Sequence, residues 1–120
     1  MKKLLIVDDE QQYLDSLAVY LRKKFVVSTA GSYSESIAEL EIGVEIALID
    51  IRLDEADDNN VDGLKILEWI KMNKPEVATF VMSAYREFSY AEEALNLGAK
   101  HFFKKPIDIL SLVAILEEKA

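Results

Sequence analysis

The chain has 120 residues, which suits a single domain, and 51% of them are hydrophobic, which is ample for one core. Its formal net charge of −8, from 14 basic and 22 acidic residues, argues against direct nucleic-acid binding by this domain. It contains no cysteine, which excludes a disulfide framework and a thiolate metal site. The first apolar run, Leu4 to Val7, ends too early for a signal peptide or a membrane span, so we expect a cytoplasmic domain without a membrane partner.

Five short apolar runs alternate along the chain with segments of helical spacing. The runs cover residues 4–7, 25–27, 46–49, 79–82 and 101–103. Helical spacing is clearest in the first and fourth intervening segments, at Leu14, Leu17, Ala18 and Leu21 and at Phe88, Ala91, Ala94 and Leu95. Because the runs do not alternate with polar residues, they suit strands of a parallel sheet buried between two helix layers. The pattern predicts a doubly wound α/β fold of (βα)5 type, in one domain over residues 1–120.

Helix-capping residues agree with these boundaries. Ser32 or Ser34 could cap the second helix, Gly98 could close the fourth, and Asp108 could cap the fifth. The segment 54–60 fits no element, since it is polar and acidic, and we expect it to be an exposed loop between the third strand and the third helix.

Polar residues stand at the ends of four of the runs, where ligands bind in open α/β sheets. They are Asp8, Asp9 and Glu10 after the first run, Asp50 at the end of the third, Ser83 after the fourth, and Lys105-Pro106 after the fifth. Several carboxylates in one crevice repel one another unless a cation lies among them. Mg²⁺ prefers such oxygen ligands and commonly shares its coordination shell with phosphate.

This arrangement suggests phosphoryl transfer. Asp8 and Asp9 are the candidate holders of the metal, and Asp50 beside the cation could be the nucleophile that forms an aspartyl-phosphate. Lys105 could bring a positive charge, and Ser83 a hydrogen-bond donor, to the phosphoryl oxygens.

Each of these residues also has an ordinary structural explanation. The acids after the first strand could cap the next helix, a serine after a strand is usually a turn residue, and Lys-Pro is a common loop dipeptide. Their joint placement at the ends of the matching strands favours the functional interpretation.

The sequence resembles the response-regulator receiver family over essentially its whole length. The resemblance is carried by Leu5-Ile6-Val7-Asp8-Asp9-Glu10, Leu48-Ile49-Asp50, Asp62-Gly63-Leu64, Met82-Ser83-Ala84, and Gly98-Ala99 through Phe102 to Lys105-Pro106. It implies a flavodoxin-like sheet of order 2-1-3-4-5 and transfer of a phosphoryl group to Asp50 from a sensor histidine kinase or a phosphotransfer protein. It also implies a signalling domain that turns over no external substrate, within a regulator that could be longer than this chain and could control transcription.

The resemblance further assigns roles to single residues. It implies Mg²⁺, with Mn²⁺ as an alternative, bound by Asp9 directly, by Asp8 through water, by Asp50, and by the backbone carbonyl of Arg52. Ser83 and Phe102 would form the switch that relays phosphorylation to the face made by the fourth helix, fifth strand and fifth helix, where a second copy of the chain could bind. Arg52 and Tyr85 would tune the lifetime of the phosphoryl group, and the bond before Pro106 would be cis.

One segment departs from the family pattern. Asp50 and Gly63 are 13 positions apart, about five residues more than in most receivers, and the usual Met-Pro pair is missing. The acids of segment 54–60 could draw in cations, repel a phosphodonor, or keep the loop solvated, and the last is the simplest interpretation. As a hypothesis, the insertion shields the phosphoryl group or tunes the choice of partner.

Three other functions are compatible with parts of the sequence. A Mg²⁺-dependent phosphohydrolase would use an aspartyl-phosphate too, but Asp8-Asp9-Glu10 is not the Asp-x-Asp of haloacid-dehalogenase-like phosphatases. A flavin-binding protein would need a glycine-rich or hydroxyl-rich loop where these acids stand. A degenerate receiver that only docks partners is disfavoured because the acids, Ser83 and Lys105 are all present. His101 and Trp69 are expected to be structural.

Overall fold

The computed structural model describes residues 1–54, 56–84 and 88–120. Strands and helices alternate strictly along it. The strands are β1 (Lys3–Val7), β2 (Val26–Ala30), β3 (Ile46–Asp50), β4 (Ala78–Ser83) and β5 (Phe102–Lys104). The helices are α1 (Gln11–Leu21), α2 (Tyr33–Ile42), α3 (Asp62–Asn73), α4 (Phe88–Asn96) and α5 (Ile109–Lys119).

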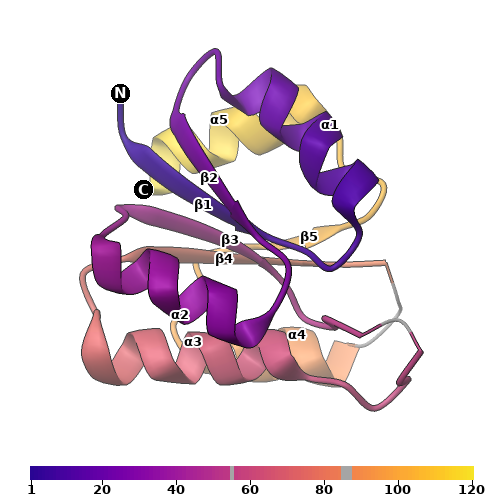
Figure 1. The fold of residues 1–120 in the computed structure, drawn as a ribbon. Coiled ribbons are helices and arrows are strands. Elements are labelled where there is room, and N and C mark those ends of the chain that lie inside the picture. Colours follow the sequence, from indigo (N-terminus) through magenta and orange to yellow (C-terminus); the bar gives the residue numbers. More distant parts are fainter. Residues whose placement is uncertain (55, 85–87) are drawn as a thin grey trace.

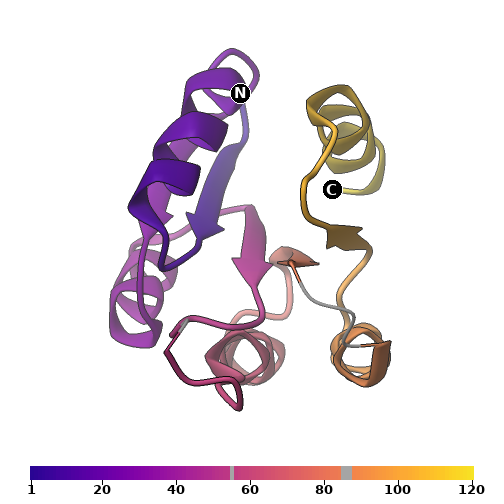
Figure 2. The same cartoon turned by 90° about the vertical axis from the view of Figure 1, so that its right-hand side faces the viewer.

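The strands form one parallel sheet between two layers of helices. Their order is β2-β1-β3-β4-β5, which confirms the predicted fold class and sheet order. Helices α1 and α5 cover one face, and α2, α3 and α4 cover the other (Figures 1 and 2). Because all strands are parallel, their carboxyl ends meet at a single edge of the sheet.

Side chains of the central strands enter the two cores alternately. In β1, Leu4 and Ile6 belong to the core under α1 and α5, whereas Leu5 and Val7 belong to the core under α2, α3 and α4. All four side chains are fully buried. A strand buried on both faces needs apolar residues at every position, which explains why the runs in the sequence do not alternate.

Strand β2 differs from its prediction, because it continues past the apolar run to Ala30 and takes in Ser28 and Thr29. It lies at the edge of the sheet, where its neighbouring strand is β1. Its middle residues are half-buried, so it tolerates polar side chains that a central strand would exclude. The apolar pattern therefore marks the start of this strand and misses its end.

The predicted capping residues lie at helix ends. The Ser32 side chain accepts a hydrogen bond from Glu35 N–H at 3.2 Å, and the Asp108 carboxylate accepts one from Ser111 N–H at 3.0 Å. Gly98, two residues after α4, has a φ of 99°, a conformation that glycine adopts without strain.

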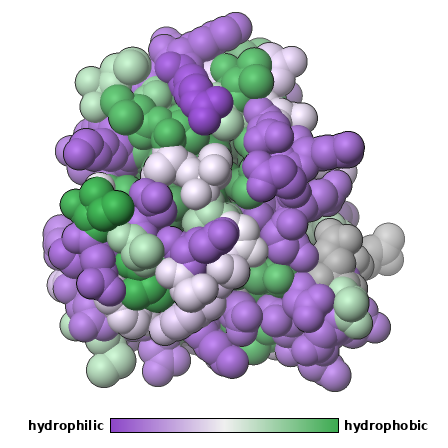
Figure 3. All heavy atoms as spheres, viewed as in Figure 1, coloured by the Kyte–Doolittle hydropathy of each residue, from purple (hydrophilic) through white to green (hydrophobic). Residues whose placement is uncertain are grey.

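Within the described residues, no helix is long and apolar enough to cross a membrane. On the face drawn in Figure 3, hydrophilic side chains surround apolar ones that form separate patches. Ile42 and Met72 are the large apolar side chains most exposed on α2 and α3, at 76% each. Scattered apolar residues of this kind are normal on a monomeric surface.

Candidate functional site

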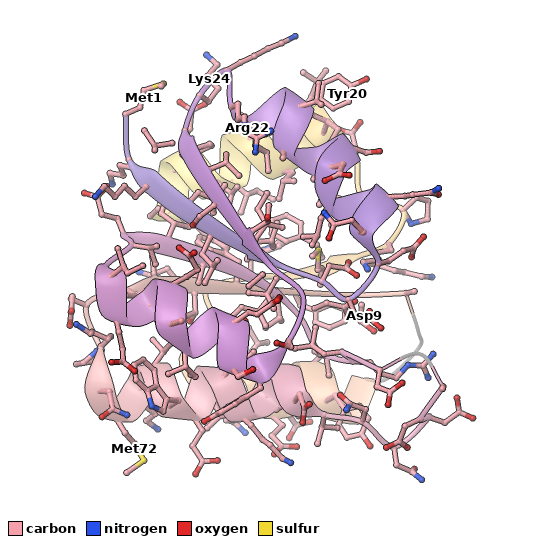
Figure 4. The ribbon with its side chains drawn as sticks, viewed as in Figure 1. Met1, Asp9, Tyr20, Arg22, Lys24 and Met72 are labelled. Carbon is pink, nitrogen blue, oxygen red and sulfur yellow. The ribbon has the colours of Figure 1, made fainter. Side chains whose placement is uncertain are left out.

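Three carboxylates meet at the carboxyl edge of the sheet. Asp8 and Asp9 follow β1, and Asp50 ends the neighbouring strand β3. Each offers a carboxylate oxygen, and these oxygens lie within 4.8 Å of one another. Figure 4 shows Asp9 at this edge, beside the start of α1. The structure thus brings together the three acids that the sequence singled out.

Asp8 is held by the backbone on both sides. Its N–H donates to the carbonyl of Ala30 at 3.1 Å, and its Oδ1 accepts the N–H of Glu10 at 2.9 Å. Its side chain is fully buried. Glu10 is the N-cap residue of α1 and makes no side-chain cap hydrogen bond. Capping of α1, the ordinary explanation for these acids, therefore does not apply to Glu10, and Asp8 accepts its hydrogen bond from the N–H of the N-cap residue.

Lys105 joins two of the carboxylates. Its Nζ donates to Asp8 Oδ2 and, at 3.0 Å, to Asp50 Oδ2, while its side chain is only 12% exposed. The Lys105 N–H donates to the Ser83 carbonyl at 2.8 Å, which anchors the loop after β5 to the end of β4. The Lys105-Pro106 peptide bond is cis.

The Tyr13 ring completes the surroundings of the ammonium. Lys105 Nζ lies over it, 4.4 Å from the ring centroid, a favourable cation–π distance. Tyr13 belongs to the first turn of α1, and its sequence position alone did not indicate a role for it. A weak signal was available, because Tyr13 follows shortly after Asp8 and Asp9 and so lies near the edge of the sheet where these acids stand.

Burial and charge act in opposite directions on these groups. Burial raises the pKa of Asp50 to about 7, with Lys105 lowering it and Asp8 raising it further. Burial would lower the pKa of Lys105, but the carboxylates of Asp50 and Asp8 raise it above its ordinary value. Burial also raises the pKa of Tyr13. The ammonium therefore stays charged, and it offsets only part of the negative charge in the site.

The donor set fits a hard divalent cation. Three carboxylates and one ammonium carry a net negative charge when all are ionised, and their oxygens converge on one small volume. Mg²⁺ takes oxygen ligands of this kind and retains several waters. Asp8, Asp9 and Asp50 would supply the side-chain ligands. A cation at this position would relieve the repulsion among these acids.

Comparison with known proteins identifies the family. The model of the response regulator receiver domain matches residues 4–117. The chain belongs to the response regulator receiver family. A receiver domain protein of the CheY-like type from Methanospirillum hungatei has the same fold, with a TM-score of 0.89, 28% identity, and coverage of 99% of this chain and 93% of that one. The receiver domain of NtrX from Brucella abortus gives a TM-score of 0.85 at 26% identity, covering 97% of this chain and 96% of that one.

Curated relatives are longer than this receiver. The acid tolerance regulatory protein ActR of Rhizobium meliloti is 32% identical over 120 residues, which are 98% of this chain and 59% of the relative. The photosynthetic apparatus regulatory protein RegA of Cereibacter sphaeroides is 30% identical, over 89% of this chain and 56% of the relative. The regulatory protein YesN of Bacillus subtilis is 29% identical, over 98% of this chain but only 32% of the relative.

In this receiver, the two expected switch residues lie on adjacent strands. Ser83 ends β4 and is 1% exposed. Phe102 is the first residue of β5 and pairs with Val81 of β4, and Val81 precedes Ser83 by two residues. Because side chains alternate along a strand, Ser83, Val81 and Phe102 share one face of the sheet. Phe102 is half-buried and packs against the core under α2, α3 and α4. Tyr85, expected to tune the phosphoryl lifetime, lies outside the described residues.

Hydrogen bonds to one side chain tie together the two ends of the loop between β3 and α3, which contains the acidic segment 54–60. Asn60 Oδ1 accepts two backbone hydrogen bonds, from Leu53 N–H and from Asp62 N–H, both at 3.0 Å. The described residues of segment 54–59 are exposed, as expected from the sequence. This role of Asn60 was not predictable, since asparagine in a polar loop is an ordinary turn residue and nothing in the sequence pattern marks this one.

Gly63 places the start of α3 directly against the strand that carries Asp50. Its N–H donates to the Ile51 carbonyl at 2.9 Å. A Cβ at position 63 would lie 2.1 Å from the Asp50 carbonyl oxygen and 2.6 Å from the Ile51 Cα, so no side chain fits here. This close approach explains why a glycine stands at position 63, in the first turn of α3.

Proposed function

We propose that this receiver is a phosphoacceptor switch in which Asp50 takes a phosphoryl group from a sensor histidine kinase or a phosphotransfer protein. The observation that carries the proposal is the joint position of Asp8, Asp9 and Asp50 within one small volume, with Lys105 bonded to two of them. A single acid at the end of a strand would indicate no particular chemistry. A buried carboxylate, Asp50, next to two acids that can bind a metal and to the Lys105 ammonium is an arrangement that suits phosphoryl transfer.

In the transfer step, a carboxylate oxygen of Asp50 attacks the phosphorus of the donor. The bond between phosphorus and the donor's imidazole nitrogen breaks, and the electron pair stays on that nitrogen, which takes up a proton. Bound Mg²⁺, or Mn²⁺ in its place, would neutralise negative charge on the acids and on the transferred group. Asp8, Asp9, Asp50 and the Arg52 backbone carbonyl are the proposed ligands.

Lys105 and Ser83 are proposed to bind the product. The Lys105 ammonium already lies 3.0 Å from Asp50 Oδ2, so a small movement would bring it to a phosphoryl oxygen on that side chain. Ser83 is the last residue of β4, the strand next to β3, and is buried. Its hydroxyl could donate a hydrogen bond to another phosphoryl oxygen. Both groups would stabilise a charge that exists only after transfer.

The switch would act through the face formed by α4, β5 and α5. Movement of Ser83 toward the phosphoryl group would free space beside Phe102, which shares its face of the sheet. Leu110 on α5 and Leu95 on α4 are 81% and 49% exposed, so two of the elements that form this face carry exposed apolar side chains, and a second copy of the chain or another partner could bind here. We also propose that this receiver is cytoplasmic, that it turns over no external substrate, and that it takes part in the control of transcription.

Phosphoryl uptake tests the proposal directly. The chain is incubated with Mg²⁺ and acetyl phosphate, and its intact mass is compared with that of an Asp50→Asn variant. We expect one phosphoryl adduct on the unchanged chain, none on D50N, and none when EDTA replaces Mg²⁺. Failure of Asp50 to take up a phosphoryl group from acetyl phosphate or from any kinase would falsify the proposal. Consumption of the donor without an adduct would instead indicate a phosphohydrolase.

A further inference from the structure

Three groups from the described residues surround the Lys105 ammonium, and one of them is an aromatic ring. Nζ donates to the carboxylates of Asp8 and Asp50, and it lies over the Tyr13 ring, 4.4 Å from the centroid. The Lys105 side chain is 12% exposed. Because little water reaches the ammonium, the ring contact should be stronger here than at an exposed site.

The Lys105 ammonium also contacts the proposed phosphoacceptor directly. Its Nζ lies 3.0 Å from Asp50 Oδ2. Arg52 contacts the same carboxylate through its backbone N–H, 3.3 Å from Oδ1, and its Nη1 donates to Asp58 at 3.2 Å. Lys105 therefore brings a side-chain positive charge to the oxygen atoms that would carry the phosphoryl group.

Metal binding and phosphoryl transfer would act on the two carboxylates and leave the ring as it is. In the proposed function Asp8 is a metal ligand, and Asp50 loses its free carboxylate when it accepts the phosphoryl group. Tyr13 is neutral at physiological pH and lies in the first turn of α1, outside the proposed ligand set. Cation–π attraction extends to about 6 Å from the ring centroid. The ring could thus keep its contact while the ammonium moves slightly toward the phosphoryl oxygens.

We propose that Tyr13 is a positioning residue that keeps the Lys105 ammonium directed at Asp50 while a phosphoryl group is transferred to it. The inference rests on the proposed function, since it concerns the reaction at Asp50. It adds to the strand-end residues a side chain from α1 that acts on the reaction through Lys105.

Loss of the ring should affect the reaction more than the resting position of Lys105. In the free chain both ion pairs remain when Tyr13 is replaced, so Lys105 should stay near Asp8 and Asp50. Once Asp8 serves the metal, the lysine would keep one ion pair. Its stem is flexible and its charge is strongly hydrated, so it would have to be ordered as the phosphoryl group arrives. A charge that is already in place avoids that cost.

Two substitutions at Tyr13 and one matched control test the inference. Tyr13→Leu removes the ring, and Tyr13→Phe removes the hydroxyl alone. Tyr20→Leu is the control, since Tyr20 lies on the same helix, is 51% exposed, and has Lys23 Nζ 5.8 Å from its ring centroid.

Phosphoryl uptake is the first measurement. Each chain is mixed with Mg²⁺ and acetyl phosphate, and formation of the adduct is followed by intact mass over time. We expect Y13L to take up the phosphoryl group about threefold to tenfold more slowly than the unchanged chain. Y13F, which keeps the ring, and Y20L should both react at close to the unchanged rate.

Lys105→Met tests whether Tyr13 acts through the ammonium. K105M keeps Asp50 and the proposed metal ligands, so it should still form the adduct, but more slowly. If Tyr13 acts through Lys105, the double variant Y13L/K105M should react at the rate of K105M alone. A further slowing in the double variant, by the factor seen in Y13L, would overturn the inference.

The ring contact is also observable without any reaction. An aromatic ring shifts the NMR signals of protons that lie over its face, so the methylene protons next to the Lys105 ammonium should be displaced in the metal-free unchanged chain and in Y13F. They should return to ordinary lysine values in Y13L, and their loss in K105M identifies them. Undisplaced signals in the unchanged chain would contradict the inference.

The rates separate failure of this inference from failure of the proposed function. Equal uptake by Y13L and Y20L, or uptake by Y13F as slow as by Y13L, would overturn the role of the ring while the adduct still forms on Asp50. Absence of any adduct on the unchanged chain would instead count against the proposed function.

Discussion

Two connections of this receiver reach the same site but are positioned by different means. The β1–α1 connection, residues 8–10, is a direct continuation of a buried strand, and its Asp8 is fully buried and bonded to backbone on both sides. The β3–α3 connection, residues 51–61, is buried over its first three residues and exposed at the described positions from 54 to 59, and it is fixed by Asn60, by the Arg52–Asp58 pair and by close packing at Gly63. Strand geometry thus places the acids, whereas a few side-chain contacts and one main-chain contact place the long loop.

We expect the largest loss of stability when a side chain is added at Gly63, where the β3–α3 connection packs against β3. Because a Cβ there would lie 2.1 Å from the Asp50 carbonyl oxygen, Gly63→Ala must displace backbone, and we expect it to lower the free energy of unfolding by about 3 kcal/mol. Gly31→Ala is the control, since its Cβ would meet only Glu35 Oε1 at 3.4 Å and the Asp8 carbonyl at 3.7 Å. Urea denaturation measures both, and similar losses would contradict the packing argument.

We expect stabilisation by Mg²⁺ to depend on the acids of the β1–α1 connection and not on those of the β3–α3 connection. Mg²⁺ at about 100 times its dissociation constant should stabilise the unchanged chain by about 2.7 kcal/mol. Asp9→Asn in the first connection should abolish most of that gain, whereas Asp57→Asn in the second should retain it. Thermal denaturation with Mg²⁺ and with EDTA gives the comparison. A reduced gain in D57N would show that the insertion draws in the cation.

Removing the Asn60 side chain, which ties the two ends of the β3–α3 loop together, should reduce stability somewhat less. Asn60→Ala leaves the N–H groups of Leu53 and Asp62 without their shared acceptor, which we expect to cost about 2 kcal/mol of stability. Asn59→Ala, at an exposed neighbour, is the matched control and should be nearly neutral. Chemical denaturation of the two variants measures the difference. Equal stabilities would mean that Asn60 is not what closes the loop.

The smallest expected effect concerns the first connection and the aromatic ring that follows it. Tyr13→Leu removes the cation–π contact with the partly buried Lys105 ammonium and should cost about 1 kcal/mol. Tyr13→Phe keeps the ring and should retain most of the stability. Denaturation midpoints of the two variants decide between the ring and the hydroxyl. A larger loss in Y13F than in Y13L would show that the hydroxyl matters.

The same contrast explains how far the sequence could predict the fold. Central strands such as β1 and β3 are buried on both faces, so their apolar runs fix their positions almost to the residue. The end of β2 was missed because an edge strand accepts Ser28 and Thr29. The capping roles of Ser32 and Asp108 were predictable, since a cap is a local interaction read within a few residues.

The site was predictable to a similar extent. Asp8, Asp9, Asp50 and Lys105 stand at strand ends, and a parallel sheet brings strand ends together whatever the detail of the loops. Asn60 and the Asp58 contact were not predictable, because a loop of many polar residues can fold back in many ways. Tyr13 falls between these cases, since its helical position was clear but its distance from the ammonium was not.

The contact at Gly63 has a consequence for how this protein can change over evolution. Helix α3 meets the strand of Asp50 there through main chain alone, with the Gly63 N–H bonded to the Ile51 carbonyl. Spacing between the reactive strand and the helix is thus independent of the side chains that α3 presents to solvent. The exposed surface of α3 can therefore diversify while the distance from the helix to the reactive carboxylate stays the same.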